Sequence, residues 1–91
     1  MRRITELKHR FVILSEVLRS THDAAYLTVA QKIMINQERA DLLRCIVAYY
    51  NNRNSKRTFK VSDEIENIVT RVVYDFEIKY SDTLFDDYIV L

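Results

Sequence analysis

The sequence contains no glycine and no proline among its 91 residues. A chain of this length at average usage carries about eleven of these two residues. Glycine supplies positive φ angles and lets the backbone approach a ligand closely, whereas proline ends helices and shapes turns. Helix interiors need neither residue, so their absence favours helices over tight hairpins and bulges.

The lack of glycine also excludes several kinds of site. A P-loop, a dinucleotide-binding fingerprint and a G-x-S-x-G elbow each require glycine for their backbone geometry. An anion site at a helix N-terminus needs no glycine and is not excluded. The sequence therefore indicates architecture more directly than it indicates function.

Metal-binding residue types are scarce. The soft or imidazole ligands are Cys45, His9 and His22, which show no paired spacing, whereas a structural zinc site takes four ligands. We interpret Cys45 as a small core residue, His9 as a surface helix residue and His22 as a loop or capping residue. We therefore predict no metal and no cofactor. The single cysteine cannot form an internal disulfide, which fits a reducing compartment.

An enzyme is the least favoured class of function. Cys45 paired with a histidine would be the candidate nucleophile, but its apolar neighbours favour an inert buried thiol over a reactive thiolate. Adjacent carboxylates such as Asp63 and Glu64 diverge by about 100° on a helix, so they do not form an acid/base couple. We predict that the chain is not an enzyme.

Long apolar runs are missing as well. The uncharged stretches fall well short of the roughly 20 apolar residues that span a bilayer. The basic N-terminus is interrupted by Glu6, Lys8, His9 and Arg10 before any apolar signal region can form. We expect no membrane association and a cytoplasmic location.

Charge is divided unevenly along a chain whose net charge is only +1. Residues 1–60 hold 12 Lys and Arg against 5 Asp and Glu, a balance of +7. Residues 61–91 hold 2 against 8, a balance of −6. The acidic part is expected to dock on the basic part, within one chain or between two copies. An outside partner for one of these surfaces is the competing interpretation.

Apolar spacing predicts a first helix over residues 3–20. One face recurs at steps of three and four and is widened by further apolar residues, which indicates burial by more than one neighbouring helix. The face comprises Ile4, Leu7, Phe11, Leu14 and Leu18, with Val12, Ile13 and Val17 beside it.

Capping residue types at Ser20, Thr21 and Asp23 predict a break at 20–22 and a second helix from about residue 23. This helix is expected to run to about Tyr50, either as one long helix or as two nearly collinear ones separated at Asn36. Residues 51–56 are a predicted loop, because asparagine tolerates left-handed conformations. Residues 57–61 are expected to be extended.

A third helix is predicted from an N-cap at Ser62, with acidic residues near the positive end of the helix dipole. Its apolar face extends to Tyr80, although alternating residues over 74–80 also fit a strand. Ser81 or Asp82 is expected to cap a last short helix. The whole chain, 1–91, is predicted to be a single all-α domain, a bundle of three to five helices completed by self-association.

Two surfaces are candidates for function. The basic stretch Arg53, Lys56, Arg57 and Lys60 follows two tyrosines, and such a combination can contact nucleic acid; residues 2–10 carry a second basic cluster. The aromatic, acidic C-terminal third is the other candidate, because aromatic residues are enriched at protein interfaces. Its expected partner-interface residues are Tyr74, Ile78, Phe85 and Tyr88, the first two as a pair on one helix face.

The favoured function is a small non-enzymatic binding module. We expect it to regulate or inhibit a protein partner through a helix face, as a homo-oligomer. The alternative is a nucleic-acid-binding regulator that uses the 53–60 and 2–10 basic clusters.

Overall fold

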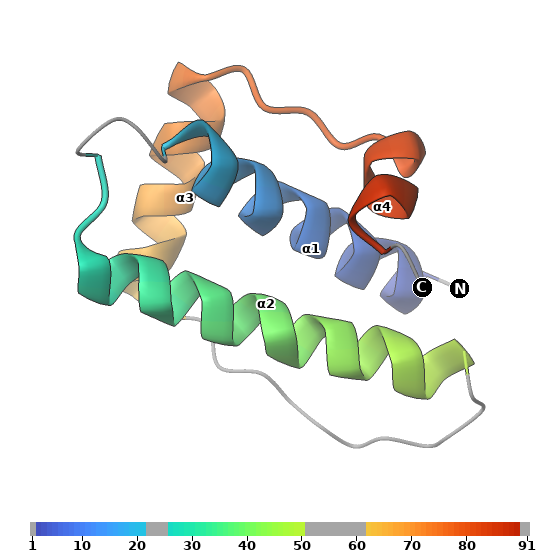
Figure 1. The fold of residues 1–91 in the computed structure, drawn as a ribbon. Coiled ribbons are helices and arrows are strands. Elements are labelled where there is room, and N and C mark those ends of the chain that lie inside the picture. The colour runs from blue at the N-terminus through green and yellow to red at the C-terminus, as the bar shows by residue number, and fades with distance from the viewer. Residues whose placement is uncertain (1, 22–25, 51–61, 90–91) are drawn as a thin grey trace.

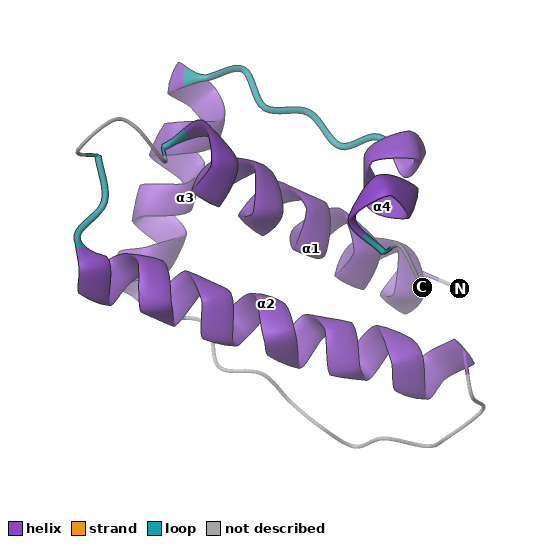
Figure 2. Ribbon diagram, viewed as in Figure 1, coloured by secondary structure: helices purple, strands orange, loops and turns teal. Residues whose placement is uncertain are grey.

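The computed structural model describes residues 2–21, 26–50 and 62–89. These residues form four helices and no strand (Figures 1 and 2): α1 (Arg2–Ser20), α2 (Val29–Tyr50), α3 (Asp63–Asp75) and α4 (Asp82–Tyr88). The predicted all-α fold is confirmed, and the strand alternative for 74–80 is wrong. The predicted loop at 51–56 and the extended segment at 57–61 lie outside the described residues.

Helix α1 lies at the centre of the bundle. Figure 1 shows α2 running alongside α1 in the opposite direction, while α3 and α4 pack on the remaining sides of α1. Contact with all three other helices explains why the apolar face of α1 is so wide. The apolar residues of α1 that are buried are Leu7, Phe11, Val12, Ile13, Leu14 and Val17.

Helix α2 begins at Val29 rather than near residue 23, which corrects the sequence prediction. The cause is a reciprocal capping box at Thr28 and Gln31. The Thr28 hydroxyl accepts from the Gln31 backbone N–H at 3.1 Å, and the Gln31 side-chain oxygen accepts from the Thr28 N–H at 2.9 Å. These two bonds satisfy backbone donors that a helix start otherwise leaves free, so Thr28 is a better N-cap than the earlier polar residues.

Helix α2 continues through Asn36 without a break, so the single-helix interpretation is correct. Its core-facing side carries a buried glutamate, Glu38, which the apolar spacing did not reveal. Arg10 of α1 neutralises this charge, with Nε 3.0 Å and Nη2 2.8 Å from Glu38 Oε1. Arg10 Nη1 also lies 2.7 Å from Glu66 Oε2, so one guanidinium joins α1, α2 and α3.

Helix α3 starts after Ser62 as predicted, but the Ser62 side chain makes no capping hydrogen bond. The helix ends at Asp75, five residues before the predicted end at Tyr80. Glu77 adopts a φ of 52°, a left-handed conformation that usually falls to glycine. The Ile78 N–H then bonds to Val73 O at 3.0 Å and the Glu77 N–H to Tyr74 O at 3.4 Å, which is the Schellman arrangement.

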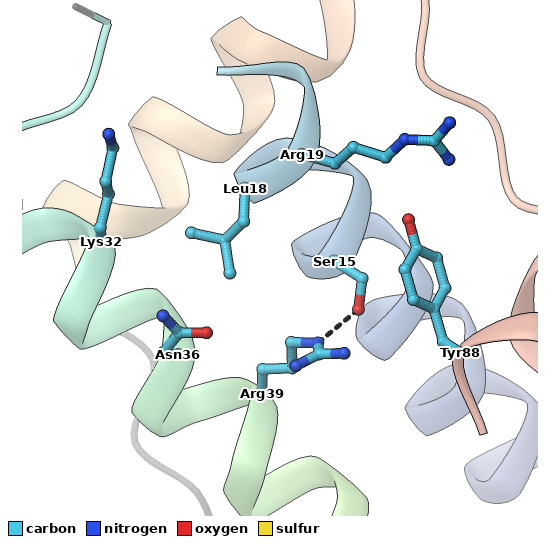
Figure 3. A pocket seen from close by; sticks show the side chains of 7 residues that line it. All are labelled: Ser15, Leu18, Arg19, Lys32, Asn36, Arg39 and Tyr88. Atoms are coloured by element: carbon cyan, nitrogen blue, oxygen red, sulfur yellow. Dashed lines mark hydrogen bonds between the residues drawn. The ribbon is translucent and has the colours of Figure 1, made fainter. Parts of the chain in front are cut away.

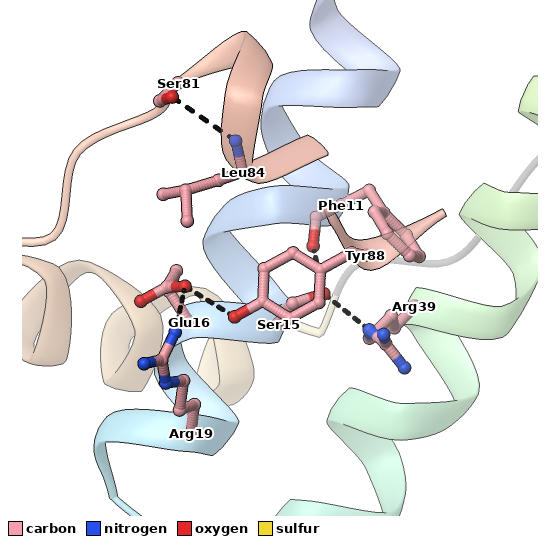
Figure 4. Close-up of polar contacts among 8 residues, drawn as sticks. All are labelled: Phe11, Ser15, Glu16, Arg19, Arg39, Ser81, Leu84 and Tyr88. Carbon is pink, nitrogen blue, oxygen red and sulfur yellow. Dashed lines mark hydrogen bonds and ion pairs between the residues drawn. The ribbon is translucent and has the colours of Figure 1, made fainter. Parts of the chain in front are cut away.

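Helix α4 follows an N-cap at Ser81, whose side chain accepts from the Leu84 N–H at 3.3 Å (Figure 4). This confirms the predicted short last helix. Phe85 enters the core edge-on to Phe11, with ring centroids 6.0 Å apart. Within the described part of the chain, no helix combines the length and the apolar character that crossing a bilayer requires.

Candidate functional site

The outward face of α2 carries apolar residues that no other described helix covers. Val29 is 73% exposed, Ile33 53% and Val47 41%, and Ala40 is exposed as well. Ile33, Ala40 and Val47 are seven residues apart, and all four lie within about 40° of one another around the helix axis. We name these four residues the α2 stripe.

Such a stripe is unusual for a surface. Single exposed apolar residues are normal, whereas several exposed apolar residues aligned along one helix face indicate a site of contact. Spacing of four and seven residues is also the spacing by which one helix packs along another. Asn36 lies between Ile33 and Ala40 on the same side and is the polar interruption of the row.

A basic pocket of about 490 Å³ opens beside this face, between α1, α2 and the end of α4 (Figure 3). Its cationic side chains are Arg19 from α1 and Lys32 and Arg39 from α2. The remaining lining residues are Ser15, Leu18, Asn36 and Tyr88. Lys32, Asn36 and Arg39 recur at steps of four and three, which brings them to one side of α2.

Arg39 is held firmly in this pocket. Its Nε donates to Ser15 Oγ at 2.5 Å, and the Ser15 hydroxyl donates in turn to the Phe11 carbonyl at 2.8 Å. The guanidinium carbon lies 4.7 Å from the ring centroid of Phe11 and 5.8 Å from that of Tyr88. Stacking and the single hydrogen bond fix the cation without neutralising it, because no described carboxylate forms an ion pair with Arg39.

Tyr88 forms the α4 wall of the pocket. Its hydroxyl donates to Glu16 Oε1 at 2.5 Å, and the same oxygen lies 3.5 Å from Arg19 Nη1 (Figure 4). Burial, together with the bond to Glu16, raises the pKa of the Tyr88 hydroxyl above its ordinary value. Glu16 is thereby engaged by two partners.

A second hollow of about 380 Å³ lies between α1 and α3. Ile13, Val69 and Val73 supply its apolar lining. Its cation, Arg10, is neutralised by Glu38 and Glu66, and its remaining charged lining residue is the exposed carboxylate Glu6. It is better explained as a groove left between packed helices.

The four predicted interface residues differ in how deeply the structure buries them. Tyr74 is 83% exposed near the end of α3, and its role in an interface stays a prediction. The predicted pairing of Tyr74 with Ile78 on one helix is wrong, because α3 ends between them and Ile78 packs against the core. Phe85 is 5% exposed and therefore lies in the core, while Tyr88 is half-buried at the basic pocket.

The predicted nucleic-acid residues Arg53, Lys56, Arg57 and Lys60 lie outside the described residues. In the second basic cluster, Lys8 lies over the Phe85 ring, 4.6 Å from its centroid, and Arg10 is paired with Glu38 and Glu66. The described members of that cluster are thus engaged within the fold.

Cys45, His9 and His22 were predicted to have no metal-binding or catalytic role. Cys45 is buried in the core on α2, as predicted. His9 is exposed on α1, with its ring centroid 5.0 Å from that of Tyr80, and His22 lies outside the described residues. Over the described ranges, no three His, Cys, Asp or Glu side chains gather in a way that could hold a metal ion.

Sequence reasoning missed both the α2 stripe and the basic pocket. The seven-residue spacing of Ile33, Ala40 and Val47 was visible in the sequence, but it was not singled out as a candidate surface. The spacing of Lys32, Asn36 and Arg39 was visible too. Ser15, Arg19 and Tyr88 come close to them only in the folded chain. The chain matches no model of a known protein family, and no curated protein or solved structure is significantly similar to it.

Proposed function

We propose that this chain is a small non-enzymatic binding module that regulates or inhibits a protein partner through the outward face of α2. The observation that carries the proposal is the α2 stripe: four apolar residues aligned on a helix face that no other described helix covers. Burying such a row against a partner is favourable by roughly 25 cal/mol for each Å² of apolar surface removed from water.

The spacing of the stripe suits a helical partner. Residues at four- and seven-residue intervals interlock with the side chains of a helix laid alongside them. A second copy of α2 has the same spacing, so self-association through this face is part of the proposal. From Val29 to Val47 the α2 stripe is about 27 Å long, at a rise of about 1.5 Å per residue.

Site-specific crosslinking tests this assignment. A photoreactive residue replaces Ala40 in the α2 stripe, and a matched control places it at Thr70, an exposed position on α3. We expect the probe at Ala40 to crosslink one predominant protein that the probe at Thr70 does not capture. Once purified, that protein should bind the Ile33→Glu variant of this chain more weakly than it binds the wild type. Indistinguishable products from the two positions, or undiminished binding by Ile33→Glu, would contradict the proposal.

Light scattering on the purified chain addresses self-association. We expect a dimer that dissociates when Ile33→Glu or Val47→Glu places a charge in the stripe. A dimer that survives both substitutions would place the self-contact elsewhere, and a monomer at all concentrations would remove self-association from the proposal.

A further inference from the structure

Two cations of the basic pocket beside the α2 stripe are not neutralised by any described carboxylate. Neither Lys32 nor Arg39 makes an ion pair with a described residue. Both side chains are only half-buried, so they remain accessible to a ligand. The Glu16 carboxylate, which contacts the pocket residues Tyr88 and Arg19, is already engaged by both of them.

Arg39 is prepared for an oxyanion in particular. Its Nε donates to Ser15 and its guanidinium carbon lies over the rings of Phe11 and Tyr88, while no hydrogen bond occupies its terminal nitrogens within the described structure. A guanidinium held in one orientation with open N–H groups matches two oxygens of a carboxylate or phosphate. Because the orientation is already set, little side-chain entropy is lost on binding.

The pocket and the stripe belong to one surface. Asn36, which interrupts the α2 stripe, also lines the pocket, and Lys32 and Arg39 lie about one helical turn before and after it on the same side of α2. The acidic residues of α2 offer no competition, since Glu38 pairs with Arg10 and Asp41 with Arg44 at 2.7 Å. A helix lying on the stripe would therefore meet unneutralised positive charge along this edge.

We infer that the pocket receives an oxyanionic side chain, a carboxylate or a phosphorylated residue, from an amphipathic helix docked on the α2 stripe. This inference rests on the proposed function for the identity of the helix, but the anion site itself can be tested alone. Lys32 and Arg39 supply the charge, and the Asn36 side chain, which lines the pocket between them, supplies a neutral donor.

NMR titration with sodium phosphate and with sodium acetate, each against sodium chloride at matched ionic strength, tests the anion site. We expect saturable shifts of the Arg39 Nε–H signal and of the Asn36 amide group. Lys32→Gln, which removes no hydrogen bond or ion pair of the described structure, should weaken phosphate binding roughly fivefold or more, and Arg39→Gln at least as much. Lys79 is an exposed cation outside the pocket, so Lys79→Gln should change the phosphate affinity by less than about twofold.

Shifts that do not saturate, or equal losses for Lys32→Gln and Lys79→Gln, would overturn the anion site. Arg39→Gln also loses its contacts with Ser15 and Phe11, so Lys32→Gln decides the matter if Arg39→Gln unfolds.

A peptide experiment then distinguishes the sources of the anion. The probe is a synthetic amphipathic helix of about three heptads with a central glutamate, phosphoserine or glutamine. We expect the glutamate and phosphoserine peptides to bind more tightly than the glutamine peptide, and Lys32→Gln should remove this preference. Equal binding of all three peptides would contradict the inference. Phosphate binding without any effect of Ile33→Glu on the peptide would keep the anion site and refute the docking face.

Discussion

Glu77 occupies a backbone conformation that is unfavourable for any residue with a Cβ atom. Its φ of 52° closes the Schellman turn at the end of α3, a place where helices usually carry glycine. This chain contains no glycine at all, so the strain is the local consequence of its composition. The turn still forms because Ile78 and Val73 both pack against the core.

Replacing Glu77 by glycine should stabilise the fold. Relief of the left-handed strain outweighs the extra chain entropy of the unfolded state, and we expect a gain of about 0.5–1 kcal/mol in the free energy of unfolding. Urea denaturation followed by circular dichroism measures the difference. Glu77→Ala is the matched control and should bring no gain, since alanine keeps the Cβ atom; equal effects of the two variants would rule out backbone strain at this position.

Tyr80 should make the fold sensitive to high pH. Burial and the hydrogen bond to Asp82 raise the pKa of Tyr80 to about 12, from an ordinary value of 10.0. Below pH 10 both folded and unfolded chains keep the proton, so the stabilisation is fully present. Between pH 10 and 12 the unfolded chain releases the proton first, and the free energy of unfolding falls.

Tyr80→Phe removes this ionisation, so its stability should decline less steeply than that of the wild type over the same interval. Urea denaturation at pH 9, 10 and 11 gives the comparison. Tyr74→Phe, which makes the same substitution at an exposed tyrosine, is the matched control. A Tyr80→Phe profile that follows the wild type throughout would show that another group causes the alkaline loss.

At the scale of whole elements, the sequence predicted helices best where packing alone decides. The apolar face of α1 is wide enough that no alternative competes, and its bounds were predicted almost to the residue. The start of α2 was missed because Asp23 is a good capping residue type, while the signal that decides, Thr28 with Gln31, is reciprocal and easily overlooked. The end of α3 was missed because no glycine marks it.

The capping box at the start of α2 should contribute measurably to stability. Thr28→Ala removes the hydroxyl that accepts from the Gln31 N–H, and we expect a loss of about 1 kcal/mol in the free energy of unfolding. Thermal or urea denaturation measures this change. Thr5→Ala, at an exposed position inside α1, is the control and should not lower the free energy of unfolding. Similar losses for both variants would show that the Thr28 cap does not stabilise the fold.

At the scale of the whole molecule, α2 carries aliphatic side chains on a buried face and also on an exposed face. Ile35, Leu42 and Ile46 are fully buried, whereas Val29 and Ile33 are more than half exposed. Sequence alone could not separate the two faces, because apolar residues surround this helix. The expected docking of the basic part on the acidic part is limited in the described structure to one ion pair, Arg10 with Glu66.

The most direct test of the docking face is the double variant Ile33→Glu with Val47→Glu. Because both side chains are already exposed, the free energy of unfolding should stay within about 0.5 kcal/mol of the wild type. Association with the helical partner, whether another protein or a second copy, should weaken about 100-fold or more, since two charges would enter an apolar contact. Loss of folding would show the stripe to be structural, and unchanged association would contradict the account.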